Sequence, residues 1–148
     1  MKKTARWLGA ALIALAAFAM AACTTTLAEP EGSDSTPAAV ADLQGSWTLV
    51  WWSDPGAVPD QAITMQVDGT RVSGKSACNN YSAPLDASDS AFSVGLLATT
   101  MMLCSDDLNS AETTYQALLS AVNGWQITDG MLSLSTDGIE HLRFQGAN

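Results

Sequence analysis

Three Asp-Gly pairs, each lying between runs of apolar and β-branched residues, constrain this chain to an antiparallel sheet more than any other feature. Asp-Gly is a strong signal for a two-residue hairpin turn, because both residues tolerate a positive φ angle. The pairs are Asp68-Gly69, Asp129-Gly130 and Asp137-Gly138. The runs around them are predicted as five strands at residues 62–67, 70–74, 125–128, 131–135 and 139–144.

Three further segments complete the predicted sheet. Residues 46–52 are rich in aromatic and β-branched side chains, which favours a strand. Residues 91–94 alternate in polarity and predict another strand. Residues 81–85 predict a short strand at an edge of the sheet, because Pro84 has no backbone N–H to donate.

One helix is predicted before the last three strands. Asn109, three residues before Glu112, resembles a capping box and predicts where this helix begins. Roughly seven or eight antiparallel strands with one helix packed on them indicate an α+β domain. The apolar residues that recur at helical spacing on one face are Ala111, Tyr115, Leu118, Leu119 and Val122.

The first residues have the organisation of an export signal. Lys2, Lys3 and Arg6 precede an uncharged apolar run over residues 7–22. This run is shorter than the ~20 residues that a membrane-spanning helix requires. A signal peptide over residues 1–22 is therefore predicted.

The end of the apolar run, Met20-Ala21-Ala22-Cys23, resembles a bacterial lipobox. That resemblance implies diacylglycerol on Cys23 and cleavage just before it, with ordinary cleavage after Ala21 as the alternative. Residues 23–41 are predicted as the lipidated cysteine and a flexible tether, because their composition buries too little apolar surface to fold. Residues 42–148 are predicted to form the folded domain.

Net charge limits the partners of this domain. Removal of residues 1–22 leaves three basic residues against 15 acidic ones, a net charge of −12. Such a surface repels phosphate backbones, so nucleic acid is excluded as a partner. It also disfavours electrostatic adhesion to an anionic bilayer, so attachment to the membrane is expected through the N-terminal lipid.

Four segments, at residues 43–47, 68–74, 77–82 and 99–104, carry a recognisable set of motifs. In this order they resemble the META domain, the HslJ-like family of bacterial envelope proteins, across residues 43–146. Ala77 and Ala83 depart from that family, in which Gly is usual, and Ala resists the positive φ that Gly permits. The residues that match the motifs are Gly45, Trp47, Gly74, Asn79, Asn80, Tyr81, Thr100 and Met102.

The resemblance implies a small antiparallel β-sheet or cracked β-barrel with one helix across it. It also implies a lipoprotein or periplasmic protein. Members of the family have been linked to stress and antibiotic tolerance. The fold is similar to the cracked barrel of type III secretion pilot lipoproteins, which bind lipid. The family implies no established enzymatic activity.

Cys78 and Cys104 are the two cysteines of the predicted domain. Outside the cytoplasm such a pair is expected to form a disulfide, with two buried free thiols as the alternative. A zinc site is not expected, because His141 is the sole histidine and the two cysteines are far apart in sequence. Neither a metal nor another cofactor is predicted.

The sequence does not predict a catalytic set. His141 is expected to be inert at a sheet surface, and a disulfide at Cys104 would prevent a Cys104–His141 dyad. Asp106-Asp107 is expected to favour the N-terminal dipole of the helix. Two of the 15 carboxylates facing one cleft would suit glycoside hydrolysis, which is kept as an alternative.

Three other features are expected to be structural. Asn79-Asn80 is expected to cap its own backbone in a turn. Trp51 and Trp52 should point to opposite faces, so that one of them meets the helix, a partner or a rim. An apolar cluster is expected to pack in the core, and the alternative is that it lines a hydrophobic ligand cavity. This cluster consists of Leu96, Leu97, Met101, Met102 and Leu103.

The protein is thus expected to be a monomeric domain, lipid-anchored to the cell membrane or outer membrane on its extracytoplasmic side. It is expected to support envelope integrity or stress and antibiotic tolerance without catalysis, by contact with an envelope protein or lipid. A carrier of lipid or another hydrophobic ligand is the first alternative. A carboxylate-dependent hydrolase is the second.

Overall fold

The computed structural model describes residues 39–147 of the chain. The predicted signal peptide, Cys23 and residues 24–38 of the predicted tether lie outside the described residues. Across residues 39–147, no helix has both the length and the apolar character needed to cross a bilayer.

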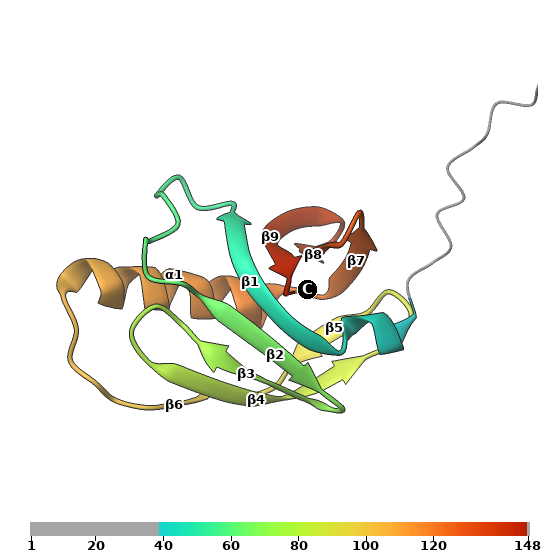
Figure 1. The fold of residues 1–148 in the computed structure, drawn as a ribbon, viewed down its shortest axis with the longest axis horizontal. Helices are drawn as coiled ribbons and strands as arrows, with labels where there is room; N and C mark the ends of the chain where they lie inside the picture. The colour runs from blue at the N-terminus through green and yellow to red at the C-terminus, as the bar shows by residue number, and fades with distance from the viewer. Residues whose placement is uncertain (1–38, 148) are drawn as a thin grey trace, which may run out of the picture. The chain divides into compact units, whose positions relative to one another are not determined.

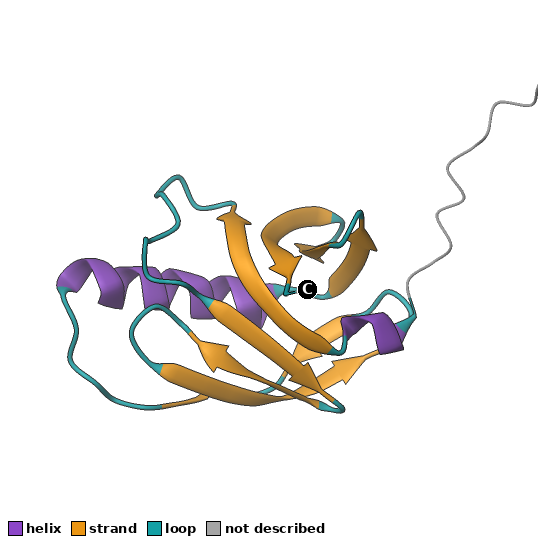
Figure 2. Cartoon of the chain, viewed as in Figure 1, coloured by secondary structure: helices purple, strands orange, loops and turns teal. Residues whose placement is uncertain are grey.

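The described domain contains nine strands and one α-helix, preceded by a single turn of 3₁₀ helix (Figures 1 and 2). The strands are β1 Gly45–Trp52, β2 Thr64–Asp68, β3 Arg71–Lys75, β4 Asn80–Ala87, β5 Phe92–Val94, β6 Ala98–Thr99, β7 Gly124–Thr128, β8 Met131–Thr136 and β9 Ile139–Gly146. The helices are η1 Val40–Leu43 and α1 Asp106–Ala121. The last two residues of the predicted tether therefore belong to η1, in which Leu43 is buried.

The strands form one antiparallel sheet in the order β5-β4-β3-β2-β1-β9-β8-β7, and β6 pairs with β4. The two ends of this order meet at a seam, where Ala91 bridges Gly124. At the seam, the Trp125 N–H donates to the Ser90 carbonyl at 3.1 Å. The domain is therefore a nearly closed barrel with one seam and a single helix, which confirms the predicted α+β cracked barrel.

Two of the three Asp-Gly pairs form the hairpin turns as predicted. Asp129-Gly130 and Asp137-Gly138 have positive φ at both residues, which is the backbone of a type I′ turn. In the first hairpin Asp68 pairs with Arg71, so the two-residue turn is Gly69-Thr70. Only Gly69 of that turn has a positive φ. This turn therefore begins one residue later than the Asp-Gly signal suggests.

β4 is not the edge strand that Pro84 predicted. It lies inside the sheet, with β3 on one side and β5 and β6 on the other. Pro84 pairs with Arg71 of β3, while β6 pairs with β4 before this proline and β5 pairs after it. The missing N–H of Pro84 thus falls in the gap between two short partner strands, where no ladder bond is lost.

α1 crosses the barrel behind β1 and β2 in Figure 1 and contributes Tyr115 and Leu119 to the core. This confirms the predicted apolar stripe. Tyr115 stacks edge-to-face on Tyr81 and Phe144, with ring centroids 5.6 and 6.4 Å apart. The predicted start of the helix was wrong, because α1 begins at Asp106 after Ser105.

The barrel interior is filled by large side chains from every part of the sheet. Fully buried aromatic and aliphatic groups from β2, β5, β8, β9 and α1 meet there, and three buried tryptophans, Trp47, Trp52 and Trp125, belong to the same cluster. The largest buried members are Tyr115, Phe92, Phe144, Leu43, Ile63, Met65, Leu119, Leu132, Leu134 and Leu142.

Candidate functional site

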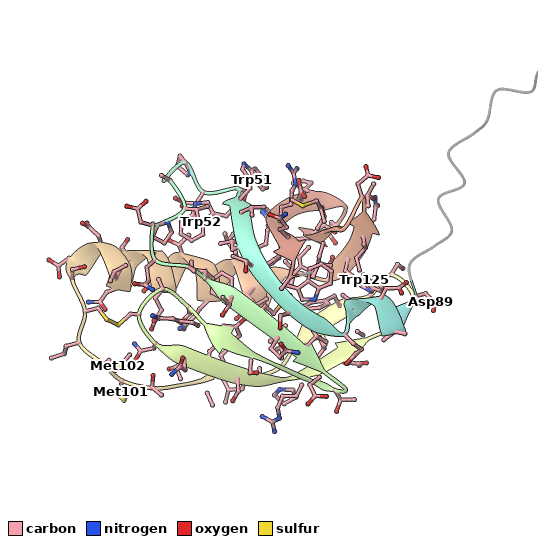
Figure 3. The ribbon with its side chains drawn as sticks, viewed as in Figure 1. Trp51, Trp52, Asp89, Met101, Met102 and Trp125 are labelled. Carbon is pink, nitrogen blue, oxygen red and sulfur yellow. A yellow bond between two sulfur atoms is a disulfide. The ribbon has the colours of Figure 1, made fainter. Side chains whose placement is uncertain are left out.

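The segment of residues 95–105, here called the apolar loop, connects β5 to α1 by way of β6. The predicted placement of its apolar cluster in the core was wrong. Leu96, Met101 and Leu103 are 93%, 96% and 100% exposed, and Met102 is 52% exposed. Only Leu97 packs against the core. Met101 and Met102 therefore do not line the barrel interior, and they lie at one end of the domain (Figure 3).

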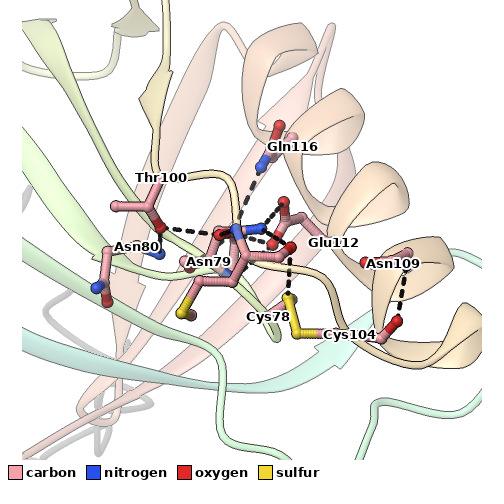
Figure 4. Close-up of a disulfide and its surroundings, with 10 residues drawn as sticks. Cys78, Asn79, Asn80, Thr100, Cys104, Asn109, Glu112 and Gln116 are labelled. Carbon is pink, nitrogen blue, oxygen red and sulfur yellow. Dashed lines mark hydrogen bonds between the residues drawn. A yellow bond between two sulfur atoms is a disulfide. The ribbon is translucent and has the colours of Figure 1, made fainter.

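Asn79 holds the apolar loop from the inside (Figure 4). Its side chain is buried, and its Oδ1 accepts hydrogen bonds from the Met102 N–H at 2.7 Å and the Thr100 hydroxyl at 2.9 Å. Its Nδ2 donates to Glu112 Oε1 at 3.1 Å. Because the backbone of residues 100–102 is fixed on its inner side, the side chains of Met101 and Leu103 are left facing solvent.

Glu112 of α1 joins this network from the other side. Its Oε2 accepts the Asn79 N–H at 2.6 Å and lies 3.0 Å from the Ser76 hydroxyl. Ser76 and Asn79 are both buried, and this carboxylate supplies the acceptor that the Asn79 N–H would otherwise lack. The capping-box prediction for Asn109 and Glu112 was wrong, since Glu112 ties the helix to the turn before β4 instead.

Ala77 provides the left-handed residue of that turn. It has φ 77° and is buried, whereas neither Asn79 nor Asn80 has a positive φ. The turn therefore keeps the backbone that glycine would favour, although Ala occupies the position. The side chain of Asn79 is structural, but it bonds Thr100, Met102 and Glu112 rather than capping its own turn as predicted.

The predicted disulfide joins Cys78 to Cys104, with their Cα atoms 6.1 Å apart (Figure 4). It links the turn before β4 to the end of the apolar loop. A cross-link over a separation of 26 residues stabilises the folded state by about 3.5 kcal/mol on the chain-entropy estimate. The bond also excludes the Cys104–His141 dyad.

Gly74 and Tyr81 support the same end of the barrel. A Cβ at Gly74 would lie 2.0 Å from the Thr64 carbonyl oxygen, so only glycine fits at this position of β3, where it lies against β2. The Tyr81 hydroxyl donates to that carbonyl at 3.1 Å and lies 2.7 Å from the Tyr115 hydroxyl. Burial raises the pKa of Tyr81 and Tyr115 well above the usual range, so both hydroxyls stay protonated.

Gly45 and Trp47 lie at the start of β1, away from the apolar loop. Gly45 has φ 125°, and the Trp47 indole N–H donates to the Leu43 carbonyl at 2.9 Å. These two motif residues therefore join η1 to the sheet. Of the eight predicted motif residues, the other six gather around the apolar loop and the turn that supports it.

A shallow hollow of about 420 Å³ adjoins the apolar loop. It lies along β4 and β6 and is lined by Asn80, Tyr81, Ser82, Ala98, Thr99 and Thr100. Exposed apolar side chains next to a hollow of this kind form a surface suited to contact with another molecule.

The remaining predicted residues lie elsewhere. Trp51 and Trp52 do point to opposite faces, since Trp52 is buried while Trp51 is 39% exposed beneath Arg143. His141 lies at the sheet surface with its Nδ1 2.8 Å from the Ser53 hydroxyl. Within residues 39–147, no three His, Cys, Asp or Glu side chains form a group that could hold a metal ion.

Comparison with known proteins identifies the domain. A model of the META domain matches residues 41–148. An NMR structure of a protein from Burkholderia xenovorans matches with a TM-score of 0.60 and 24% identity, over 81% of this chain and 99% of that one. A second NMR structure matches with a TM-score of 0.51 and 23% identity, over 69% and 88%. At these identities the two structures show the fold alone. No curated protein matches the chain significantly.

Proposed function

This chain belongs to the META domain family, and on that premise we propose that it is a lipid-anchored, extracytoplasmic, HslJ-like protein without catalytic activity. It supports envelope integrity or stress and antibiotic tolerance by presenting the apolar loop to a protein partner. The observation that carries this proposal is the exposure of Leu96, Met101 and Leu103 on a loop that a disulfide and a buried network hold in place.

The apolar loop is built to keep these side chains exposed. A flexible segment with the same residues could fold back and bury them, but Asn79 and Cys104 fix the loop at its middle and its end. A conformation fixed before binding reduces the entropy lost when a partner binds. Exposed methionines also suit contact with an apolar partner, because they adapt to irregular surfaces.

A protein partner fits this surface better than a bilayer. Residues 91–105 carry no charged side chain, yet the domain as a whole is strongly acidic and is repelled by anionic lipid. The described chain begins at Ala39, at the end of the domain opposite Met101 and Met102 (Figures 1 and 3). A tether that enters there leaves these two side chains far from its attachment point.

The loop can be tested by complementation of a strain that lacks the protein. We expect the variant M101S/L103S to be produced and folded but to restore less tolerance to a cell-wall antibiotic than the natural chain does. Ile139→Ser is the matched control, because Ile139 is an exposed apolar residue on β9 outside the loop. Full restoration by M101S/L103S would reject the role of the loop.

The anchor needs a separate test. Cys23→Ser should give a protein that is released from membranes or keeps its signal peptide, whereas the natural protein should fractionate with membranes and incorporate labelled palmitate. Membrane retention of a processed Cys23→Ser protein would reject lipid anchoring at this residue. This result would leave the test of the apolar loop unaffected.

A further inference from the structure

The outer face of β7, β8 and β9 forms a second concave surface, here called the polar groove, with a volume of about 660 Å³. This volume falls within the ~300–1,000 Å³ that is typical of small-molecule sites. The groove lies on the part of the barrel that carries Trp125, far from Met101 and Met102 (Figure 3). Its outward side chains include Gln126, Thr128, Ser133, Ser135, Glu140 and Arg143.

The sheet arranges these polar groups in rows. Gln126 of β7 is paired with Ser133 of β8, which is paired with Arg143 of β9. The row continues into β1, where Arg143 is paired with Trp51. A second row joins Gly124 to Ser135 and Glu140. Gly124 has no side chain to fill the groove, and a Cβ there would approach the Ser135 hydroxyl to 3.0 Å.

Several contacts orient the charged pair in the groove. The Glu140 carboxylate accepts a bidentate pair of hydrogen bonds from the Arg143 guanidinium, one of them 2.9 Å long. It accepts a third hydrogen bond from the Ser133 hydroxyl. The Arg143 guanidinium lies 5.2 Å from the centre of the Trp51 ring, on the other side of the pair. These contacts orient donors and acceptors in advance, which reduces the entropy lost on binding.

The chemistry of the lining narrows the class of ligand. Trp125 is the one large apolar residue in the lining, and no Leu, Ile, Val, Met or Phe joins it, which disfavours a lipid or another apolar ligand. Glu140 and Arg143 neutralise each other, so the groove lacks the net positive charge that would attract a phosphate. Glu140 is also the one carboxylate in the lining, so a pair for glycoside hydrolysis is not present there.

Hydroxyl, carboxamide, carboxylate and guanidinium groups together can donate to and accept from a ligand dense in hydroxyl groups. We infer that the polar groove binds a neutral oligosaccharide, with Gln126 and Ser135 contacting ring hydroxyls and the Glu140–Arg143 pair bridging neighbouring hydroxyls. This activity is additional to partner contact at the apolar loop. In a bacterial envelope it would let the domain hold a glycan on one face and a protein on another.

The inference can be tested by NMR titration of the full-length protein, purified in detergent, with two neutral probes. Maltotetraose carries only hydroxyl groups, whereas chitotetraose also carries acetamide groups. We expect at least one probe to cause saturable shifts of backbone amides in β7, β8 and β9. The probe that binds more tightly shows whether acetamide groups are recognised.

Variants test whether the oligosaccharide binds in the groove rather than elsewhere on the surface. Gln126→Ala should weaken binding about 3- to 10-fold, as expected for one lost hydrogen bond. Ser135→Tyr should abolish binding by filling the groove. Gln145→Ala is the control, because Gln145 is exposed on the same sheet but outside the groove, and it should bind normally.

The inference is overturned if neither probe gives saturable shifts at millimolar concentration. It is also overturned if the shifts occur outside β7–β9, or if Ser135→Tyr, shown to be folded by its amide spectrum, binds like the natural chain.

Discussion

The apolar loop and the polar groove are built in opposite ways. In the groove, polar side chains face solvent while Leu132, Leu134 and Phe144 on the same strands are fully buried. In the loop, apolar side chains face solvent while Asn79 and Ser76 are buried beneath them. The groove follows from the ordinary alternation of a strand, which any amphipathic sheet provides. In the loop the apolar side chains are outside and the polar ones inside, so its conformation depends on a few specific bonds.

The two surfaces also differ in the source of their stability. The groove should be as stable as the barrel core on which it rests. The loop should be stable only while its disulfide and the Asn79 network are intact, since exposed apolar side chains contribute little to folding. Five predictions, given in order of decreasing effect, test this difference.

Phe144→Ala should lower the free energy of unfolding most, by about 3–5 kcal/mol. Phe144 is fully buried on β9 and contacts Tyr115, so its removal leaves a cavity beneath the groove. Denaturant unfolding measures the change. A loss below about 1 kcal/mol would show that the sheet under the groove does not depend on this core.

Replacing both disulfide cysteines, as C78A/C104A, should lower the free energy of unfolding by about 3.5 kcal/mol. The shifts of amides in the apolar loop should change, while those of the groove should not. The reduced natural protein is the control and should match the variant in denaturant unfolding. A variant as stable as the oxidised natural protein would contradict the prediction.

Asn79→Ala should cost about 2–3 kcal/mol, because the Met102 N–H loses its acceptor and Glu112 Oε1 loses its donor. Faster hydrogen exchange of the Met102 amide should accompany the loss. Asn80→Ala is the matched control, since Asn80 is exposed, and it should change stability by less than about 0.5 kcal/mol. Equal effects from the two variants would reject Asn79 as the support of the loop.

Ala77→Gly should raise the free energy of unfolding by about 0.5–1 kcal/mol, because Ala77 has φ 77° and glycine adopts this backbone without strain. Ala83→Gly should do the reverse, since Ala83 is buried within β4 and has no positive φ. Thermal unfolding compares the two. The same sign for both would show that the left-handed turn at Ala77 carries no strain.

Glu140→Gln should have the smallest effect, below about 0.5 kcal/mol, because the pair with Arg143 is partly exposed to solvent. Hydrogen bonds from Arg143 lower the pKa of Glu140. A lowered pKa contributes stability above the ordinary pKa of Glu, and this stability is lost as the pH falls through the lowered value. The difference between the natural protein and Glu140→Gln should therefore shrink on acidification, as measured by denaturant unfolding from neutral to acidic pH.

Local signals predicted much of the fold. The three Asp-Gly pairs specified the hairpins, and the period of the apolar residues specified the face of α1, because turns and amphipathic faces depend on neighbouring residues. The disulfide was predicted from the number of cysteines and the expected compartment. The position of Pro84 was misjudged, since the sequence does not show that two short strands share one side of β4.

The candidate site was only partly predictable for a similar reason. Asn79, Thr100 and Met102 were identified as motif residues, but their mutual hydrogen bonds were not. Glu112 was assigned to a helix cap, although it lies beside Ser76 and Asn79, more than 30 residues earlier in the chain. No periodicity or spacing encodes such a contact, because it forms only when the helix packs against the barrel.

By itself, the sequence determined an acidic, antiparallel β domain with one amphipathic helix and a cysteine pair. Only the tertiary structure decided that Met101 and Leu103 face solvent and that polar groups of β7, β8 and β9 line one groove. The physical reason is that hydrophobicity predicts burial only when nothing else fixes the backbone. Here a buried amide and a disulfide hold the loop outward, and closure of the sheet brings distant strands together.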